Sequence, residues 1–180
     1  GDNIYDVQVQ VSDGSLTDTQ LISVTVDQVT PVIGSDGIGI DRVVDVNENT
    51  STVTTVTSSL AGTVTYSIVN QYDAGKFEIN ASTGELSFKT AYVPNFETPA
   101  DTDHNNVYKV AVNVTDGVGT DTQVIAVNVK NVNEAPVITS NGGGDTATPV
   151  SFAENSTNLV TTVTSTDVDA GASATYNIVG

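Results

Sequence analysis

Oxygen-bearing side chains gather in one connector of the sequence. The stretch KNVNEAPVI (130–138) carries Asn131, Asn133 and Glu134. At the matching positions, a shorter copy of the same connector, DQVTPVI (27–33), offers Gln28 and Thr30. Carboxylate and amide oxygens are the ligands of hard cations, and calcium (Ca2+) takes six to eight of them. The longer connector is therefore a candidate for part of a cation site, and the shorter copy predicts a poorer one.

The charge balance favours the same chemistry and excludes other partners. The chain of 180 residues has 22 Asp and Glu against five Lys and Arg, a net charge of −17. Nucleic acid and anionic membrane surfaces are excluded as partners, because both need a basic protein surface. Most of these acids are expected to keep the chain soluble, for example in an extracellular medium, while a minority converge on a cation.

Catalytic motifs are missing from the sequence. It has no cysteine, so disulfides and thiolate chemistry are excluded. It also has no Gly-rich phosphate loop and no nucleophile elbow, and its one histidine, His104, stands in a polar stretch away from a serine partner. No run of about 18 apolar residues is present, so no membrane insertion is expected. The chain is therefore not expected to be an enzyme.

The sequence contains internal repeats, and the connector lies between two of them. Residues 5–29 align with residues 108–132 without a gap, and VNENTSTVTTVTSS (46–59) matches FAENSTNLVTTVTST (152–166). The repeat unit is about 104 residues long. It divides the chain into the C-terminal part of a first repeat (1–29), a complete repeat (30–133) and the N-terminal half of a third (134–180). Such out-of-phase ends are expected of a piece of a longer array, or of a subunit whose half-domains neighbouring chains complete.

Within the repeat, the local patterns are those of β-strands. In YKVAVNVTD, apolar side chains alternate with others from Tyr108 to Val114, and VIAVNVKNV continues this period of two residues. Asp-Gly pairs join such strands as hairpins, and KFEINASTGELSF (76–88) reads as a further hairpin. Six or seven short strands in about 104 residues predict an all-β sandwich.

Several motifs in register carry a resemblance to a known family. ENT, TYSIV, KFEINASTGELSF, PNFET, YKVAVNVTDG and NVNEAPVI together resemble the cadherin-type repeat found in large bacterial surface adhesins. The resemblance covers the complete repeat and both partial ones. It implies tandem seven-stranded Greek-key sandwiches of the cadherin/immunoglobulin-like class. It also implies calcium between successive repeats, and an adhesive or spacer role in a secreted protein, outside the cell or at its surface.

The resemblance also implies which residues hold the calcium between repeats two and three. These are Glu48, Asn95, Glu97, Asn131, Asn133, Glu134, Asp167 and Asp169. Asn95 and Asn131 stand where the family usually has Asp. At the first junction, Leu60 and Gly62 occupy the positions of Asp167 and Asp169, so little or no calcium is expected there.

Three functions remain open at this stage. The first is a calcium-rigidified adhesion module or spacer whose partners are neighbouring repeats or subunits and a cell-surface or matrix ligand. The second is a carbohydrate- or matrix-binding module, for which Tyr72, Tyr92 and Phe96 are the aromatic residues expected in loops. The third is a filament subunit with half-domains completed by neighbouring chains.

Overall fold

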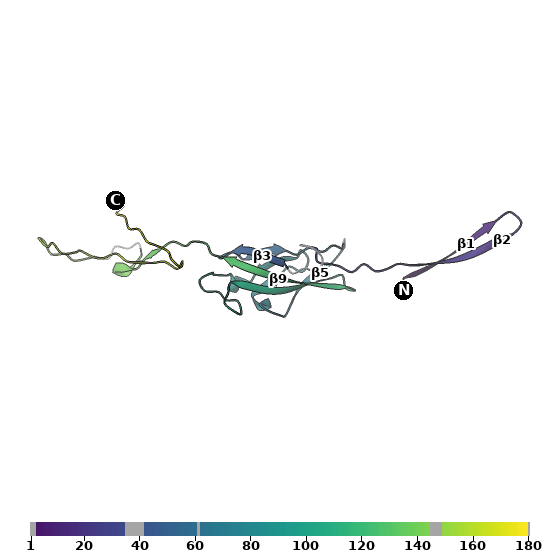
Figure 1. Cartoon of the computed structure of the whole chain (residues 1–180), viewed down its shortest axis with the longest axis horizontal. Helices are drawn as coiled ribbons and strands as arrows, with labels where there is room; N and C mark the ends of the chain where they lie inside the picture. Colours follow the sequence, from purple (N-terminus) through teal and green to yellow (C-terminus); the bar gives the residue numbers. More distant parts are fainter. Residues whose placement is uncertain (1–2, 35–41, 61, 145–148, 180) are drawn as a thin grey trace.

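The computed structural model describes residues 3–34, 42–60, 62–144 and 149–179. In Figure 1 the chain is elongated, with a β-sandwich at its centre, a separate hairpin on the N-terminal side and a largely irregular segment on the C-terminal side. Short 3-10 helices are present at η1 (Ala74–Lys76), η2 (Thr90–Tyr92) and η3 (Ser140–Gly142), and the described residues include no α-helix. None of the helices in this part of the chain is long and apolar enough to cross a membrane.

Seven strands form the central sandwich. They are β3 (Arg42–Asn47), β4 (Thr52–Thr55), β5 (Thr65–Val69), β6 (Phe77–Ile79), β7 (Glu85–Phe88), β8 (Val107–Thr115) and β9 (Thr120–Lys130). One sheet has the order β3-β9-β8-β5 and the other the order β4-β7-β6. Strand β3 runs parallel to β9, and all other pairs are antiparallel. The predicted all-β Greek-key sandwich is confirmed, since successive strands from β3 to β6 alternate between the two sheets.

The alternating apolar residues of the sequence form the core between these sheets. Tyr108, Val110, Val112 and Val114 of β8 are fully buried. Tyr108 lies edge-on against Phe88, with ring centroids 5.1 Å apart. Phe88 in turn stacks on Phe77, with ring centroids 4.5 Å apart. The hydroxyl of Tyr108 accepts a hydrogen bond of 2.9 Å from the backbone N–H of Ala100. This arrangement, in which a strand tyrosine bonds to backbone upstream, pins the loop before β8 to the core.

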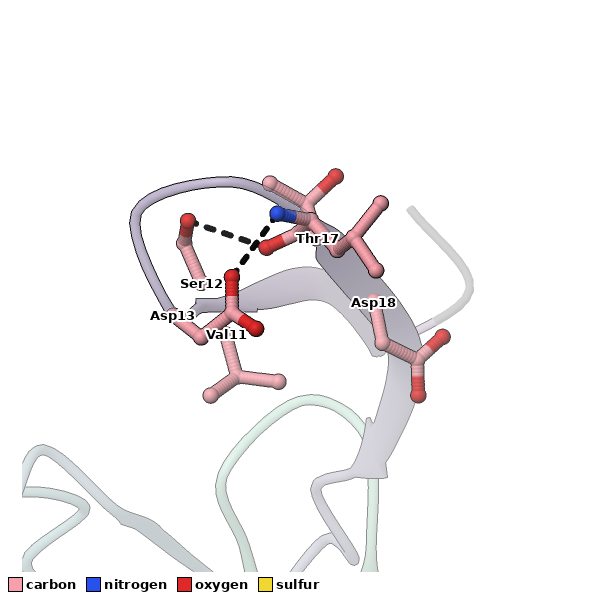
Figure 2. Close-up of a pocket in the computed structure, with 6 residues that line it drawn as sticks. Val11, Ser12, Asp13, Thr17 and Asp18 are labelled. Carbon is pink, nitrogen blue, oxygen red and sulfur yellow. Dashed lines mark hydrogen bonds between the residues drawn. The ribbon is translucent and has the colours of Figure 1, made fainter.

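The N-terminal hairpin repeats the geometry of the last two strands of the sandwich. It consists of β1 (Ile4–Ser12) and β2 (Thr17–Thr25). Tyr5 lies opposite Val24, just as Tyr108 lies opposite Val127. Asp13 closes the turn by accepting the N–H of Leu16 (Figure 2). The apolar residues of this hairpin are exposed, because no second sheet covers them among the described residues.

The C-terminal segment keeps one turn of the repeat and little regular structure. Its strands, β10 (Val137–Ile138) and β11 (Ser165–Thr166), are two residues long and pair with each other. Asn155 has a φ of 59°, as Asn49 does in the matching ENT turn of the sandwich. Large apolar side chains such as Leu159 remain exposed. The local turn is therefore the same, without the buried core that the complete repeat has.

Candidate metal centre

Three glutamates from distant parts of the sequence meet where the sandwich leads into the connector. Glu48 follows β3, Glu97 lies in the loop between η2 and β8, and Glu134 lies in the connector after β9. Each offers a carboxylate oxygen, and these three atoms lie within 4.8 Å of one another. In the part of the chain that the structure describes, this is the one group of three or more acidic, His or Cys side chains with such spacing.

Strand pairing brings two of these glutamates to the same place. Because β3 and β9 are parallel neighbours, their C-terminal ends lie at the same end of the sheet, with Asn47 opposite Lys130. The N–H of Glu48 continues this pairing by donating to the carbonyl of Lys130 at 3.0 Å. Glu48 and the connector therefore leave the sheet side by side.

The Glu48 carboxylate fastens two loops at this edge. It is 2% exposed. Its Oε1 accepts the N–H of Val132 and its Oε2 accepts the N–H of Phe96, both at 2.8 Å. Hydrogen bonds to a charged acceptor are about twice as strong as neutral ones. Glu48 thus holds the connector and the loop carrying Glu97 against the end of β3.

The other two glutamates have oxygens without a hydrogen-bond donor. Both carboxylate oxygens of Glu97 and Oε2 of Glu134 are buried and receive no hydrogen bond in the structure. Burial raises the pKa of the Glu134 carboxyl, and the negative charges of Glu48, Glu97 and Asp169 raise it further. Buried carboxylates are costly unless paired with positive charge. A bound cation would supply that charge.

The C-terminal segment contacts the same cluster through Asp169. Its Oδ2 accepts the backbone N–H of Glu134 at 2.8 Å, and its own N–H donates to Oδ1 of Asp167 at 3.0 Å. Asp169 therefore lies next to the glutamates, whereas Asp167 closes the local turn with one oxygen. The acidic residues thus come from both sides of the connector.

The structure gives the three predicted asparagines different surroundings. Oδ1 of Asn95 accepts hydrogen bonds from the N–H and the hydroxyl of Thr98, so this oxygen closes its own turn. Asn133 donates from its side-chain amide to the carbonyl of Glu134 at 3.0 Å, and Asn131 is exposed. Of the predicted ligands in the described residues, only the three glutamates form the close group.

Sequence reasoning missed one residue that supports this site. Asn106 donates from its side-chain amide to the carbonyl of Phe96 at 2.9 Å, which anchors the loop just before Glu97. Its backbone has a φ of 64°, a left-handed conformation that Asn adopts more easily than most residues. In the sequence it belongs to the polar run DTDHNN, whose composition indicates only a loop.

The first junction is built from other contacts. Asp116 uses Oδ1 to accept the N–H groups of Val118 and Gly119 in its own hairpin. The backbone of Gly119 approaches the connector so closely that an added Cβ would lie 2.7 Å from Cγ2 of Thr30. Ile33 is held by a 2.8 Å hydrogen bond from its N–H to Asp121. These contacts fix the start of the connected segment onto the sandwich itself, and none of them involves the N-terminal hairpin.

Comparison with known proteins identifies the fold. No family model matches the sequence, and no curated protein matches it either. Solved structures do match, and several are extracellular domains of protocadherins. The structure of the human protocadherin-24 EC1-2 fragment is 20% identical, with a TM-score of 0.51, and the match covers 80% of this chain and 64% of that one.

Two structures of protocadherin gamma B7 match over more of the chain. The EC3-6 cis-dimer structure and the structure of extracellular cadherin domains 1–4 are each 19% identical, with TM-scores of 0.50 and 0.51, and each match covers 94% of this chain. The chain spans 44% and 42% of their lengths. At this level of identity the likeness defines the class of fold alone: the central sandwich has a cadherin-like fold.

Proposed function

We propose that the chain is a calcium-binding, cadherin-like repeat unit that serves as an adhesion module or rigid spacer outside the cell. The observation that carries the proposal is the group formed by Glu48, Glu97 and Glu134, in which three buried oxygens have no hydrogen-bond donor. Unpaired carboxylates at this density favour a hard cation over an empty site. The cadherin-like fold supports an adhesive role, since the similar structures are cadherin extracellular domains.

The ligands we assign come from both sides of the connector. Glu48, Glu97 and Glu134 would provide the central carboxylates, with Asp169 and Asp167 from the C-terminal segment. Asn95, Asn131 and Asn133 would add amide or backbone oxygens. Six to eight oxygens suit calcium, and magnesium would need a more regular octahedron. Bound calcium would supply positive charge and no redox or covalent chemistry, so the role is structural.

The expected energy of binding assigns the ion a mechanical role. Extracellular calcium modules have dissociation constants of about 10⁻⁴–10⁻³ M. At about 1 mM calcium, binding stabilises the folded state by about 0.4–1.4 kcal/mol per ion. This is too little to fold a sandwich, but it is enough to choose between a straight and a bent junction. Calcium would thus act as a clamp between repeats two and three.

The first junction would work without calcium. Its connector lacks the Asn and Glu residues of the second, Leu60 and Gly62 replace the aspartate pair, and Asp116 is occupied in its own hairpin. We therefore propose a joint without calcium, in which Thr30 and Pro31 of the connector pack against Gly119 of the sandwich that follows. The chain would combine one calcium-dependent joint with one calcium-independent joint.

Melting and small-angle scattering of the chain, with calcium and with the chelator EGTA, test this proposal. We expect calcium to raise the melting temperature and to lengthen or narrow the distribution of molecular shapes. Magnesium at the same concentration is the control and should do much less. Identical melting and scattering with calcium and EGTA would contradict the proposal.

A further inference from the structure

The central sandwich has a cavity that shares no lining residue with the carboxylate cluster. Its volume is about 260 Å³, and it is lined by Tyr72, Asp73, Thr102, Asp103, Val107 and Lys109. These residues come from the turn before η1, the loop before β8, and the start of β8 itself. None of them belongs to the proposed calcium site.

The backbone of Tyr72 is the unusual feature of this cavity. Its φ is 53°, in the left-handed region, and its side chain is 58% exposed. The other non-glycine residues with positive φ in the described part of the chain are five asparagines and His104. Asparagine tolerates this conformation, whereas a bulky aromatic residue is an outlier there. Strained residues are characteristic of binding sites, where the surrounding structure holds them in place.

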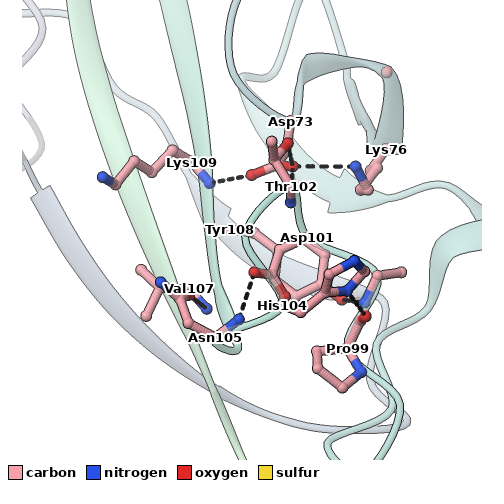
Figure 3. A network of polar contacts seen from close by, with 12 residues as sticks. Asp73, Lys76, Pro99, Asp101, Thr102, His104, Asn105, Val107, Tyr108 and Lys109 are labelled. Carbon is pink, nitrogen blue, oxygen red and sulfur yellow. Dashed lines mark hydrogen bonds and ion pairs between the residues drawn. The ribbon is translucent and has the colours of Figure 1, made fainter.

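Hydrogen bonds on the next residue hold Tyr72 in this position. The N–H of Asp73 donates to the carbonyl of Lys109 at 2.9 Å, and Oδ2 of Asp73 accepts the N–H of Lys109 at 3.0 Å. Oδ1 of Asp73 accepts the N–H and hydroxyl of Thr102 and the ammonium of Lys76 (Figure 3). Asp73 is thus fully engaged as an anchor, and the neighbouring Tyr72 is exposed and lines the cavity.

The polar groups left for a ligand include a donor and an acceptor. The Lys109 side chain extends away from the Asp73 carboxylate in Figure 3, and Lys109 is exposed. Asp103 uses Oδ2 to accept a hydrogen bond from Asn105 at 2.8 Å, and its second oxygen remains as an acceptor. Tyr72 and Val107 supply the apolar surface. A ligand for this cavity needs hydroxyl groups that donate and accept, together with a face of C–H groups.

From this arrangement we propose that the cavity is a subsite for one neutral pyranose ring of a carbohydrate. The C–H face of a sugar carries partial positive charge and suits the negative face of an aromatic ring such as Tyr72. The cavity is smaller than the roughly 300–1,000 Å³ of sites for drug-sized ligands, so a single ring is the appropriate size. The net charge of −17 repels acidic sugars, which favours a neutral one.

Amide NMR spectra of the chain in calcium test this subsite. The methyl β-pyranosides of glucose, galactose and mannose are titrated separately to about 50 mM, well above a dissociation constant of about 1 mM. We expect at least one of them to produce saturable shifts that cluster at Tyr72, Asp103 and Lys109. Absence of shifts with all three sugars, or shifts away from these residues, would overturn the proposal.

Two variants separate the contribution of the Tyr72 ring to sugar binding from any effect on folding. Tyr72→Asn removes the ring with a residue that tolerates the left-handed backbone, so the turn should stay folded. It should weaken binding at least about tenfold, which corresponds to about 1.4 kcal/mol. Tyr92→Ala, at a second exposed tyrosine, is the control and should bind as the wild type does. Equal binding by Tyr72→Asn and wild type, or tighter binding of methyl glucuronide than of the neutral sugars, would contradict the assignment.

Discussion

The backbone N–H of Glu134 donates to Oδ2 of Asp169 at 2.8 Å, which joins the connector to a segment 35 residues further along the chain. This contact brings the charge of Asp169 next to Glu134. Burial and the charges of Glu48, Glu97 and Asp169 together raise the pKa of the Glu134 carboxyl. Negative charge from the sandwich, the connector and the C-terminal segment is therefore concentrated here, which is the basis for the cation that we propose.

Glu97→Gln tests the cluster with little damage to the protein. Neither carboxylate oxygen of Glu97 has a hydrogen-bond donor, so the substitution removes a charge without breaking a hydrogen bond. We expect calcium affinity to fall about tenfold or more, while stability in EGTA stays the same or rises. Calorimetric titration with calcium and urea unfolding in EGTA measure the two effects.

The matched control for this variant is Glu78→Gln, at an exposed position on β6. It removes the same charge from the chain and leaves the cluster intact, so its calcium affinity should equal that of the wild type. If both variants lose affinity equally, the effect comes from net charge and the assigned site is wrong.

Glu48→Gln is predicted to behave differently, because Glu48 has a structural role even without the ion. Both of its oxygens accept backbone N–H groups, from Val132 and Phe96. A glutamine would direct its NH₂ group at one of these donors and leave it unsatisfied. We expect a loss of about 1–3 kcal/mol in the free energy of unfolding in EGTA. Urea unfolding measures it, and an unchanged midpoint and slope would show that these hydrogen bonds do not matter.

The pH dependence of the junction follows from the raised pKa of Glu134. The Glu134 carboxyl binds a proton more readily in the folded junction than in the unfolded chain. Protonation of Glu134 therefore stabilises the folded junction at low pH. This stabilisation is lost as the pH rises through the raised pKa, above the ordinary value of 4.5. In EGTA, the contact between Glu134 and Asp169 should therefore strengthen on acidification toward this window. Hydrogen exchange at the Glu134 amide, corrected for the intrinsic effect of pH, reports it.

With calcium present, acidification should weaken the junction and not strengthen it, because protons compete with the ion for the same carboxylates. Calcium affinity should fall as the pH is lowered from about 7.5 to about 5.5. An affinity that is constant over this range would argue against Glu134 as a ligand.

Gly84 tests the packing of the sandwich that supports the site. Its φ is 74°, and an added Cβ would lie 2.1 Å from the backbone oxygen of Val56. Gly84→Ala should destabilise the complete repeat by about 3 kcal/mol or more, in the range of strained or overpacked substitutions. The control is Gly75→Ala, where a Cβ meets nothing within 4 Å. Thermal melting compares them, and similar melting temperatures would contradict the close approach at Gly84.

Much of the fold follows from the alternation of side chains along the sequence. The buried series from Tyr108 to Val114 and the hairpin that pairs Phe77 with Phe88 agree with the predicted strands. Such patterns are readable because a strand places every second residue on the same face. The grouping of Glu48, Glu97 and Glu134 agrees with the ligand set implied by the family resemblance, although their role as ligands stays a proposal.

The loops could not be read in the same way. The turn of Asn95 onto Thr98, and the use of Glu48 to bind two backbone N–H groups, depend on φ and ψ values that residue types alone do not determine. The same holds for Tyr72, which the sequence places only in a loop and whose left-handed backbone directs it to a cavity. Composition indicates where loops are, but tertiary contacts decide where their side chains point.

The most direct test of the central claim is a calcium titration followed in the amide NMR spectrum of the whole chain. We predict saturable shifts at the amides of Phe96, Val132 and Glu134, which border the carboxylates of the second junction. Over the same range the amide signals of Thr30, Val32 and Ile33, at the first junction, should not shift. Amides around Glu134 that do not respond to calcium, or equal calcium affinity at both junctions, would contradict a calcium site specific to the second junction.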